Sequence, residues 1–241
     1  MTALSGAVSF LTIVGRAGAP DRRSLIWFGP VGLMVGGTCG LVRWGAGAWW
    51  AAGVAAALTV AADLVLTGAL HLDGLADTAD GVLPHLDRQR RLAVMAAPDV
   101  GAFAVAVVGV TLLLRWSALG TVDVEGWRWV ALLAGLWCAG RTAMAVVLAT
   151  VSYAHPDGGL ATAFAGGTAW GPLAIGAALS LAGAGAGAGV GGLVGLGCGA
   201  LAAAGVVALA ARRLGGFTGD VLGAAGTVLE TVALVVVAAS W

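Results

Sequence analysis

Charge is what this sequence has least of. Only 10% of its 241 residues are charged, whereas 60% are hydrophobic. A soluble domain of this length would not carry so much apolar surface, and several apolar runs approach the roughly 20 residues that a spanning helix needs. These runs do not alternate between polar and apolar residues as the strands of a membrane barrel would. The composition therefore predicts an all-α, polytopic transmembrane helix bundle, with residues 1–241 forming a single integral membrane domain.

Lysine is absent and cysteine is scarce. All 12 basic residues are arginine, which we attribute to codon or lineage bias, and the formal net charge is zero. Electrostatics therefore gives no reason to expect nucleic-acid binding. Cys39, Cys138 and Cys198 are far apart inside apolar runs and lack the spacing of metal ligands. The N-terminus has no basic start followed by a cleavage site, so we expect no removable signal peptide.

The apolar residues form a series of candidate spans, at 27–42, 47–70, 100–119, 128–150, 169–187, 190–211 and 221–240. We therefore expect about seven spans. Residues 1–14 are apolar but short, which predicts an additional interfacial or re-entrant helix. The Gly/Ala stretch at 182–192 predicts a tight turn between closely packed helices.

Arginine is concentrated in alternate loops, as Arg16, Arg22, Arg23, Arg88, Arg90, Arg91, Arg212 and Arg213. The positive-inside rule makes those loops cytoplasmic. With about seven spans, the polar segment that follows residue 70 and the loops at 151–168 and 212–220 all reach that same side. Each of these polar loops can therefore contribute to one site at the cytoplasmic face.

Three of the chain's 12 acidic residues, Asp73, Asp77 and Asp80, lie within eight positions at the end of an apolar run. In a helix turning by about 100° per residue they fall within about 60° of one another, so their charges repel. Because charges near a membrane are costly to dehydrate, such a stripe calls for a cation. Mg²⁺ is the natural candidate, since it binds carboxylates and leaves positions open for substrate phosphates.

The core Asp77-x-x-Asp80-Gly81 also opens a pattern used for metal-dependent transfer from a diphosphate-linked alcohol, in which two metal ions grip the diphosphate. Two other interpretations of the acids are open. One is a set of solvated carboxylates that terminates a span, and the other is the ion site of an ion-coupled membrane transporter.

Further polar residues are candidates for substrate contacts, each with a structural alternative. Arg141 lies within or at the end of a span and needs an acid or a phosphate as its partner. Thr218 and Gly219 suit close approach to a phosphate, but also a turn in which Asp220 caps a helix. His71 lies on the opposite side of the helix from the acids, where a packed or capping imidazole is the simpler interpretation.

Taken together, these segments resemble the cobalamin synthase family, the adenosylcobinamide-GDP ribazoletransferases. Residues 67–81 are similar to the family signature almost throughout, and residues 215–224 are similar to its C-terminal motif. Weaker matches run in order along the chain, at residues 10–12, 30–32, 88–95, 101–103, Arg141 and 153–154. The chain departs from the pattern at Ala96, Ala97, Asp99, His155 and Thr227, so we expect no acid to act at position 97 or 227.

The resemblance implies a Mg²⁺-dependent membrane transferase. It would join α-ribazole, or its 5′-phosphate, to adenosylcobinamide-GDP, with release of GMP and formation of adenosylcobalamin or its phosphate. Asp73, Asp77 and Asp80 would bind metal and diphosphate. A general base among Asp99, Asp220 and the core acid Asp80 would accept the ribazole proton. The residues expected to contact substrate are His71, Arg141, Thr218 and Gly219.

The resemblance also implies an integral protein of the bacterial inner membrane whose active site faces the cytoplasm. Its expected partners are small-molecule substrates and the lipid bilayer, without nucleic acid, and a homo-oligomer is left open. The rival functions are a CDP-alcohol phosphotransferase-like lipid enzyme and an ion-coupled transporter. The enzyme is favoured because the acids lie at the expected membrane edge, on the same side as the glycine-rich motif and several arginines. A shared site requires Asp220 to lie within about 15 Å of Asp77, because metal ions in such sites are only roughly 4 Å apart.

Overall fold

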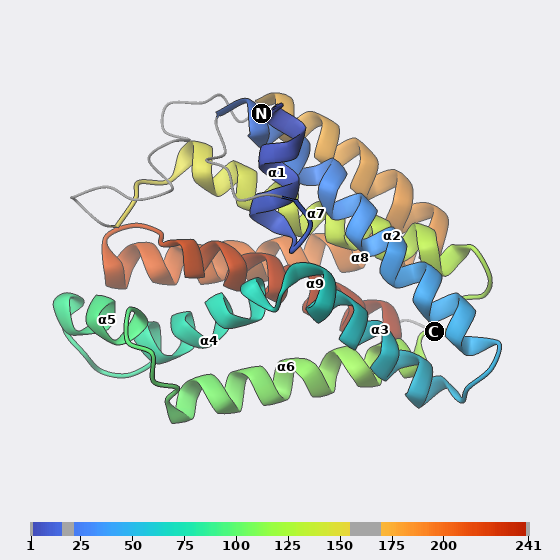
Figure 1. Cartoon of the computed structure of the whole chain (residues 1–241), viewed down its shortest axis with the longest axis horizontal. Helices are drawn as coiled ribbons and strands as arrows, with labels where there is room; N and C mark the ends of the chain where they lie inside the picture. Colours follow the sequence, from blue (N-terminus) through green and yellow to red (C-terminus); the bar gives the residue numbers. More distant parts are fainter. Residues whose placement is uncertain (1, 16–21, 155–169, 240–241) are drawn as a thin grey trace.

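The computed structural model describes residues 2–15, 22–154 and 170–239, and within these ranges it contains helices and no β-strand (Figure 1). The all-α prediction is therefore confirmed. The predicted loop residues at 16–21 and 155–169, Arg16 and His155 among them, lie outside the described residues. The elements are α1 (Ala3–Leu11), the 3₁₀ helix η1 (Arg22–Trp27), α2 (Phe28–Gly47), α3 (Ala52–Thr67), α4 (Leu70–Val82), α5 (Arg88–Met95), α6 (Ala102–Thr121), α7 (Arg128–Thr150), α8 (Trp170–Leu214) and α9 (Gly219–Ala239).

Five of the described helical segments are long and apolar enough to cross a membrane: η1 with α2, then α6, α7, α8 and α9. A sixth candidate is the pair formed by α3 and α4, which is bent by 89° at the break between them. The 45-residue α8 is about twice as long as a span needs to be, and its backbone is not helical at Ala188 and Gly189. Its two arms correspond to the predicted runs 169–187 and 190–211, so the expected count of about seven is roughly consistent with the structure.

The break in α8 is the tight turn predicted for residues 182–192. Gly189 has a φ of +57°, a left-handed conformation that glycine adopts without strain. A Cβ atom added to Gly192 would overlap the backbone of Ala184, so the two arms touch just beside the turn. The second arm then returns beside α9, with which α8 makes extensive contact.

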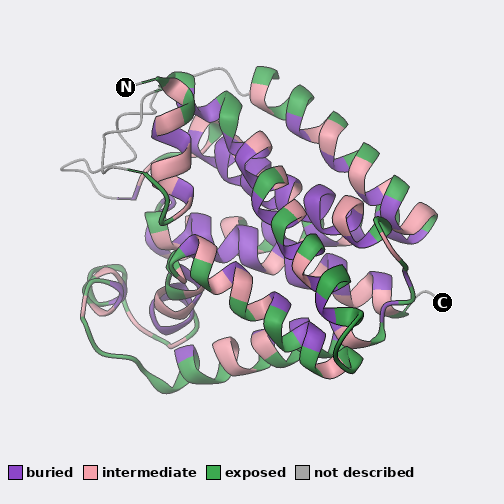
Figure 2. Cartoon of the chain, turned by 45° about the vertical axis from the view of Figure 1, so that its right-hand side comes forward, coloured by how far each residue is buried: buried purple, intermediate pink, exposed green. Residues whose placement is uncertain are grey.

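α7 and α9 form the centre of the bundle. In each of them 72% of the most apolar window is buried inside the protein, compared with 28% in α6 and in α8, which therefore face outward (Figure 2). α2 lies closely against α7 because Gly32, Gly36 and Gly40 form a stripe along it. A Cβ atom at any of the three would overlap the α7 backbone, which is the small-residue packing typical of membrane helices.

Three loops that are distant in sequence meet at one end of the bundle, on the left in Figure 1. The backbone N–H of Phe217 donates to Ser152 O over 3.0 Å, and that of Ala154 donates to Phe217 O over 2.9 Å. Arg88 of α5 binds both loops, donating from Nε to Leu214 O (2.6 Å) and from Nη2 to Ala154 O (2.7 Å). The segments expected on one side of the membrane thus lie together, and the identity of that side stays a prediction.

Candidate active site

α4 carries the acidic motif and starts at a sharp break in the chain. Gly68 and Ala69 both have left-handed backbone conformations, with φ of +61° and +57°, which end α3. The amides of Leu72 and Asp73 then donate to Ala69 O over 3.0 and 2.9 Å, so that α4 leaves in a new direction. Among the described residues, Ala69 alone has a positive φ without being glycine. Such strained positions persist only where the surrounding structure holds them, and they cluster at functional sites.

The acidic motif and the C-terminal motif meet where α4 crosses α9. A Cβ atom added to Gly74 would lie 2.7 Å from Asp220 O and 3.0 Å from Asp220 Cα. Because Asp77 is one helical turn beyond Gly74, the Cα atoms of Asp77 and Asp220 are within about 10 Å of each other. The structure therefore satisfies the distance that a shared site requires.

Thr218 organises the start of α9 at this crossing. Its side-chain oxygen accepts from the N–H of Val221 over 3.3 Å, which makes it a cap of the helix, and it donates to Asp220 Oδ2 over 3.2 Å. The next residue, Gly219, has open space where a side chain would be. The capping role that the structural alternative gave to Asp220 thus belongs to Thr218, and the Asp220 carboxylate lies beside the cavity described next.

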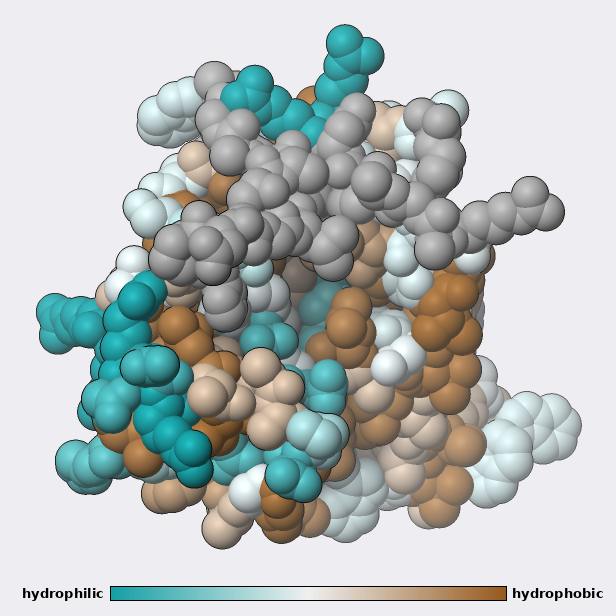
Figure 3. All heavy atoms as spheres, turned by 60° about the vertical axis from the view of Figure 1, so that its left-hand side comes forward, coloured by the Kyte–Doolittle hydropathy of each residue, from teal (hydrophilic) through white to brown (hydrophobic). Residues whose placement is uncertain are grey.

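A cavity of about 510 Å³ opens at this crossing, between α1, α4, the end of α7 and the start of α9. Its polar lining residues are Ser9, His71, Asp73, Tyr153, Thr218 and Asp220, and Gly219 is also part of the wall. This end of the molecule is hollowed near its centre, with hydrophilic side chains in and around the hollow (Figure 3). Five residues selected from the sequence therefore line one cavity, although they come from two motifs that are far apart in the chain.

The electrostatics of this region are dominated by negative charge. The half-buried Asp77 carboxylate lies in the field of Asp220, Asp73 and Asp80. Burial, and then the charge of Asp220, raise the pKa of the Tyr153 phenol. Tyr153 therefore stays protonated near neutral pH and is a hydrogen-bond donor at the cavity wall. The sequence had marked this residue only as a weak family match.

Asp80 has a structural task that the sequence did not reveal. Its carboxylate accepts from the backbone N–H of Gly101 (2.6 Å) and from that of Ala104 (3.0 Å), so it caps the N-terminus of α6. Asp80 is only 8% exposed. A carboxylate with two such bonds keeps further lone pairs, so the geometry leaves a metal contact to be tested.

Asp99 lies apart from the cavity that holds Asp220. It lines a second cavity of about 460 Å³, between α5 and the start of α6, together with Asp80 and Arg90. The two carboxylates that the sequence offered as alternative bases are therefore in different places. Of the two, Asp220 shares a cavity with Asp73.

Arg141 is held inside the bundle and does not line the cavity at the α4–α9 crossing. It is 1% exposed, and its Nη1 is paired with Glu230 Oε1. Of the two partners that we expected for a buried arginine, the structure supplies the acid. His71 borders both the cavity and this interior region, and its Nδ1 atom is buried without a hydrogen-bond partner.

Sequence reasoning missed two of the charged residues around Arg141, namely Asp63 of α3 and Arg115 of α6. Arg115 bridges Asp63 and Glu230 inside the bundle. A signal was present, because each lies alone within an apolar run, and an ionisable residue inside a membrane span is a functional candidate by default.

Mg²⁺ is the cofactor that the family resemblance implies. The carboxylate oxygens at the cavity are the type of ligand that Mg²⁺ prefers. The described part of the wall includes the carboxylates of Asp73 and Asp220 and no arginine. Within the same described ranges, no three carboxylate, imidazole or thiol groups are close enough together to hold an ion. This arrangement suits magnesium, which is usually bound through one or two carboxylates together with substrate phosphates.

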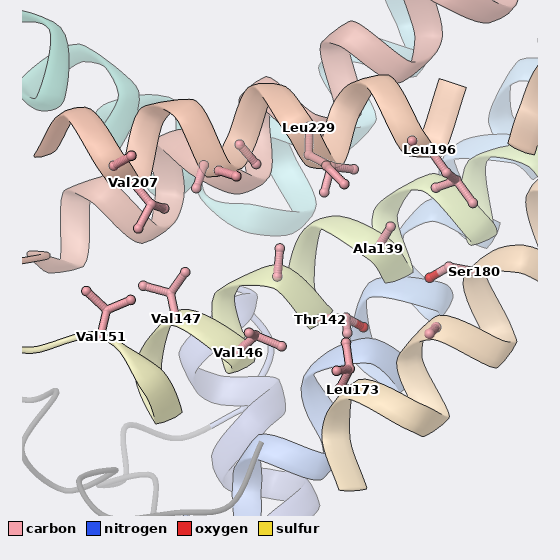
Figure 4. Close-up of a pocket in the computed structure, with 18 of the residues that line it drawn as sticks. Ala139, Thr142, Val146, Val147, Val151, Leu173, Ser180, Leu196, Val207 and Leu229 are labelled. Carbon is pink, nitrogen blue, oxygen red and sulfur yellow. The ribbon is translucent and has the colours of Figure 1, made fainter. Parts of the chain in front are cut away.

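A larger groove lies elsewhere on the described structure and is apolar. It has a volume of about 750 Å³ and runs between α7, α9 and the two arms of α8 (Figure 4). The described lining consists of side chains such as Val147, Leu196 and Leu229 and includes no titratable group. Its walls are helices that are long and apolar enough to span a membrane, and its described lining offers no group for acid–base or metal chemistry.

Comparison with known proteins gives a consistent result over nearly the full chain. An adenosylcobinamide-GDP ribazoletransferase of Chlorobaculum parvum is 36% identical, over 97% of this chain and 92% of the relative. The protein of the same name from Chlorobaculum tepidum is also 36% identical, over 99% and 96%, and that from a Roseiflexus species is 33% identical, over 95% and 86%. No solved structure matches the chain.

A family model also matches nearly the whole chain. The model for cobalamin-5-phosphate synthase covers residues 3–238, which include both motifs and all of the candidate spans except the last residue of α9. This agrees with the resemblance seen in the two motifs and with the helical membrane architecture. The chain therefore belongs to the cobalamin-5-phosphate synthase family.

Proposed function

We propose that this protein is a membrane-bound adenosylcobinamide-GDP ribazoletransferase, and that the cavity at the α4–α9 crossing is its active site. The observation that supports the site is the contact of Gly74 with Asp220, which brings the two family-like motifs to one cavity. The substrates are adenosylcobinamide-GDP and α-ribazole or its 5′-phosphate. We place this end of the bundle at the cytoplasmic face of the bacterial inner membrane, because most of the arginines outside the spans gather there.

In this proposal a ribose hydroxyl of α-ribazole attacks the phosphorus next to cobinamide. The new P–O bond forms as the bond between the two phosphates breaks, and GMP leaves. Asp220 accepts the hydroxyl proton, because it lines the cavity and Asp99 does not. Thr218 and the open backbone at Gly219 lie where the diphosphate can approach, and protonated Tyr153 donates a hydrogen bond at the same wall.

Mg²⁺ would be held by one or two of the α4 carboxylates Asp73, Asp77 and Asp80 together with substrate phosphates, which leaves Asp220 of α9 free to accept the proton. The metal would supply charge neutralisation for the diphosphate and for the leaving GMP. The acids themselves explain this need, since Asp77 lies in the field of Asp73, Asp80 and Asp220, and these negative charges repel one another and the diphosphate.

The test is an assay on purified protein in lipid nanodiscs. Adenosylcobinamide-GDP, Mg²⁺ and either α-ribazole or its 5′-phosphate are supplied, and GMP and the corrinoid product are separated by chromatography. We expect stoichiometric GMP and a completed corrinoid with at least one acceptor, and none without acceptor or after chelation of Mg²⁺. Folded wild-type protein that releases no GMP with either acceptor would overturn the proposal.

A further inference from the structure

Four charged side chains form a continuous series of ion pairs, a network in the interior of the bundle. Arg115 Nη1 of α6 lies 2.8 Å from Asp63 Oδ2 of α3, and its Nη2 lies 2.7 Å from Glu230 Oε2 of α9. Arg141 of α7 pairs with the other Glu230 oxygen. Each of these side chains is at most 10% exposed, and the network contains two acids and two bases.

Neutral groups add hydrogen bonds to the network. Trp137 Nε1 donates to Asp63 Oδ1 over 2.7 Å, and Arg115 Nε donates to Thr231 Oγ1 over 2.8 Å. Every oxygen of the two carboxylates therefore accepts at least one bond. Glu230 is the member that joins the two arginines, so its removal would leave two buried cations with one acid. Breaking a buried pair in this way is strongly unfavourable, especially inside a membrane.

This network borders the break between α3 and α4. A small internal cavity is lined by Asp63, Arg115, Arg141 and Glu230 of the network and also by Thr67 and His71. Thr67 is the last residue of α3, and His71 is in the first turn of α4. His71 Nδ1 and Arg141 Nε are both buried without a hydrogen-bond partner among the described residues. The interior polar region thus extends from the network to the start of α4.

α9 contacts the start of α4 directly as well. Thr227 Oγ1 donates to His71 O over 3.3 Å, and a Cβ atom added to Gly223 would lie 3.1 Å from His71 Cα. Asp220, Gly223, Thr227 and Glu230 lie on successive turns of α9. One helix therefore supplies a carboxylate to the cavity and anchors the helix that carries the opposing carboxylates.

We propose that Glu230 is a positioning residue for the transferase reaction. Through Arg115 and Arg141 it fixes the bent junction of α3 and α4, and so sets the direction of α4, which places Asp73 and Asp77 opposite Asp220. Glu230 itself lines the internal cavity and not the active-site cavity, so it acts only through this geometry. This inference rests on the proposed function of the α4–α9 cavity.

The principal variant is Glu230→Gln, which keeps the size of the side chain and removes its charge. Deuterium uptake by peptides covering residues 68–74 should rise, because the amides of Leu72 and Asp73 lose a rigid junction. The kcat should fall by about tenfold to a hundredfold, the cost typical of a small misplacement of reacting groups, while KM changes little. If Glu230→Gln folds and both its deuterium exchange at residues 68–74 and its kcat equal those of the wild type, the proposal is overturned.

The double variant Glu230→Gln with Arg141→Gln distinguishes a positioning role of Glu230 from a purely structural one. It removes one charge of each sign and restores the balance of the network. If Glu230 only balances charge, thermal stability and kcat recover together, which would contradict the proposal. If Glu230 positions α4, stability recovers but kcat and exchange at residues 68–74 do not, because the Arg115–Glu230–Arg141 link beside the α3–α4 junction is still missing.

Two further variants complete the experiment. Thr59→Ala is the matched control, since Thr59 is buried on α3 one turn before Asp63 and its hydroxyl donates only to Ala55 O of its own helix. It should leave kcat and exchange unchanged. If Glu230→Gln does not fold, Glu230→Asp replaces it, because aspartate keeps the charge on a shorter side chain. Deuterium exchange and kcat equal to wild type in Glu230→Asp would refute the positioning role of Glu230. Deuterium exchange can be measured without turnover, so it tests the role of Glu230 even if the wild-type protein is inactive. An inactive wild-type protein would instead refute the proposed function.

Discussion

Gly74 of α4 rests directly on the backbone of Asp220 of α9, so closely that a Cβ atom at position 74 would lie 2.7 Å from Asp220 O. The glycine is required here by the approach of two helices, not by its own backbone conformation. This contact decides the spacing between the acidic stripe and the acid of the C-terminal motif. The predictions below depend on it or on the carboxylates that it brings together.

Substitution at this contact should separate the two motifs. In Gly74→Ala, the added Cβ would overlap the Asp220 backbone, so the helices must move apart, at a cost of about 1–3 kcal/mol for overpacking. We expect a reduced kcat with intact membrane insertion, measured by GMP release and by thermal unfolding. Gly109→Ala in α6 is the control, because nothing lies within 4 Å of its added Cβ. Equal activity of the two variants would show that the contact does not set the site.

Gly219 tests the approach of substrate to the backbone. A side chain at position 219 meets no protein atom within 4 Å, so Gly219→Val should leave the thermal stability close to wild type. It should strongly reduce turnover, because the valine occupies space where we place the diphosphate. Wild-type kinetics for adenosylcobinamide-GDP in this variant would exclude diphosphate binding at Gly219.

The acidic stripe is tested by Asp77→Asn and Asp80→Asn. Each should abolish turnover at saturating Mg²⁺, because a neutral amide is a weaker ligand for a divalent ion. Asp80→Asn also loses one of two bonds to the start of α6, at a cost of about 1 kcal/mol, so the unfolding temperature should fall in that variant only. Near-normal GMP release by either variant would remove its residue from the metal site.

The choice of base is tested by comparing Asp220→Ala with Asp99→Ala. Asp220 lines the same cavity as Asp73, whereas Asp99 lines the other one. We therefore expect the rate to fall much more in Asp220→Ala, with similar expression of both proteins. The reverse order in a single-turnover measurement would move the reaction to the cavity between α5 and α6.

The orientation in the membrane is tested at Gln89, which is exposed on α5 between two arginines. Gln89→Cys is made in a chain whose three cysteines are replaced. We expect an impermeant thiol reagent to modify it in inverted vesicles and not in intact cells. Labelling from the outside of intact cells would place the arginine-rich loops, and with them the active site, outside the cytoplasm.

Hydrophobic pattern and local motifs in the sequence were enough to determine the helical membrane class, the main apolar runs, the turn in α8 and the family. These properties depend on neighbouring residues, because a run of apolar residues must lie in hydrocarbon and a spanning segment must satisfy its own backbone hydrogen bonds. The acidic stripe was visible for the same reason, since Asp73, Asp77 and Asp80 share one helix.

Only the tertiary structure decided which of these residues work together. Asp220 joins Asp73 because Gly74 lets two helices touch, whereas Asp80 turns to cap α6 and Asp99 lies in another cavity. Arg141 was open to an acid or a phosphate, and the packing of α7 against α9 selected Glu230. Such choices depend on contacts between residues far apart in the chain, so no spacing along the sequence encodes them. In a low-dielectric interior these contacts are decisive, because a buried charge must be paired by whatever group the packing brings to it.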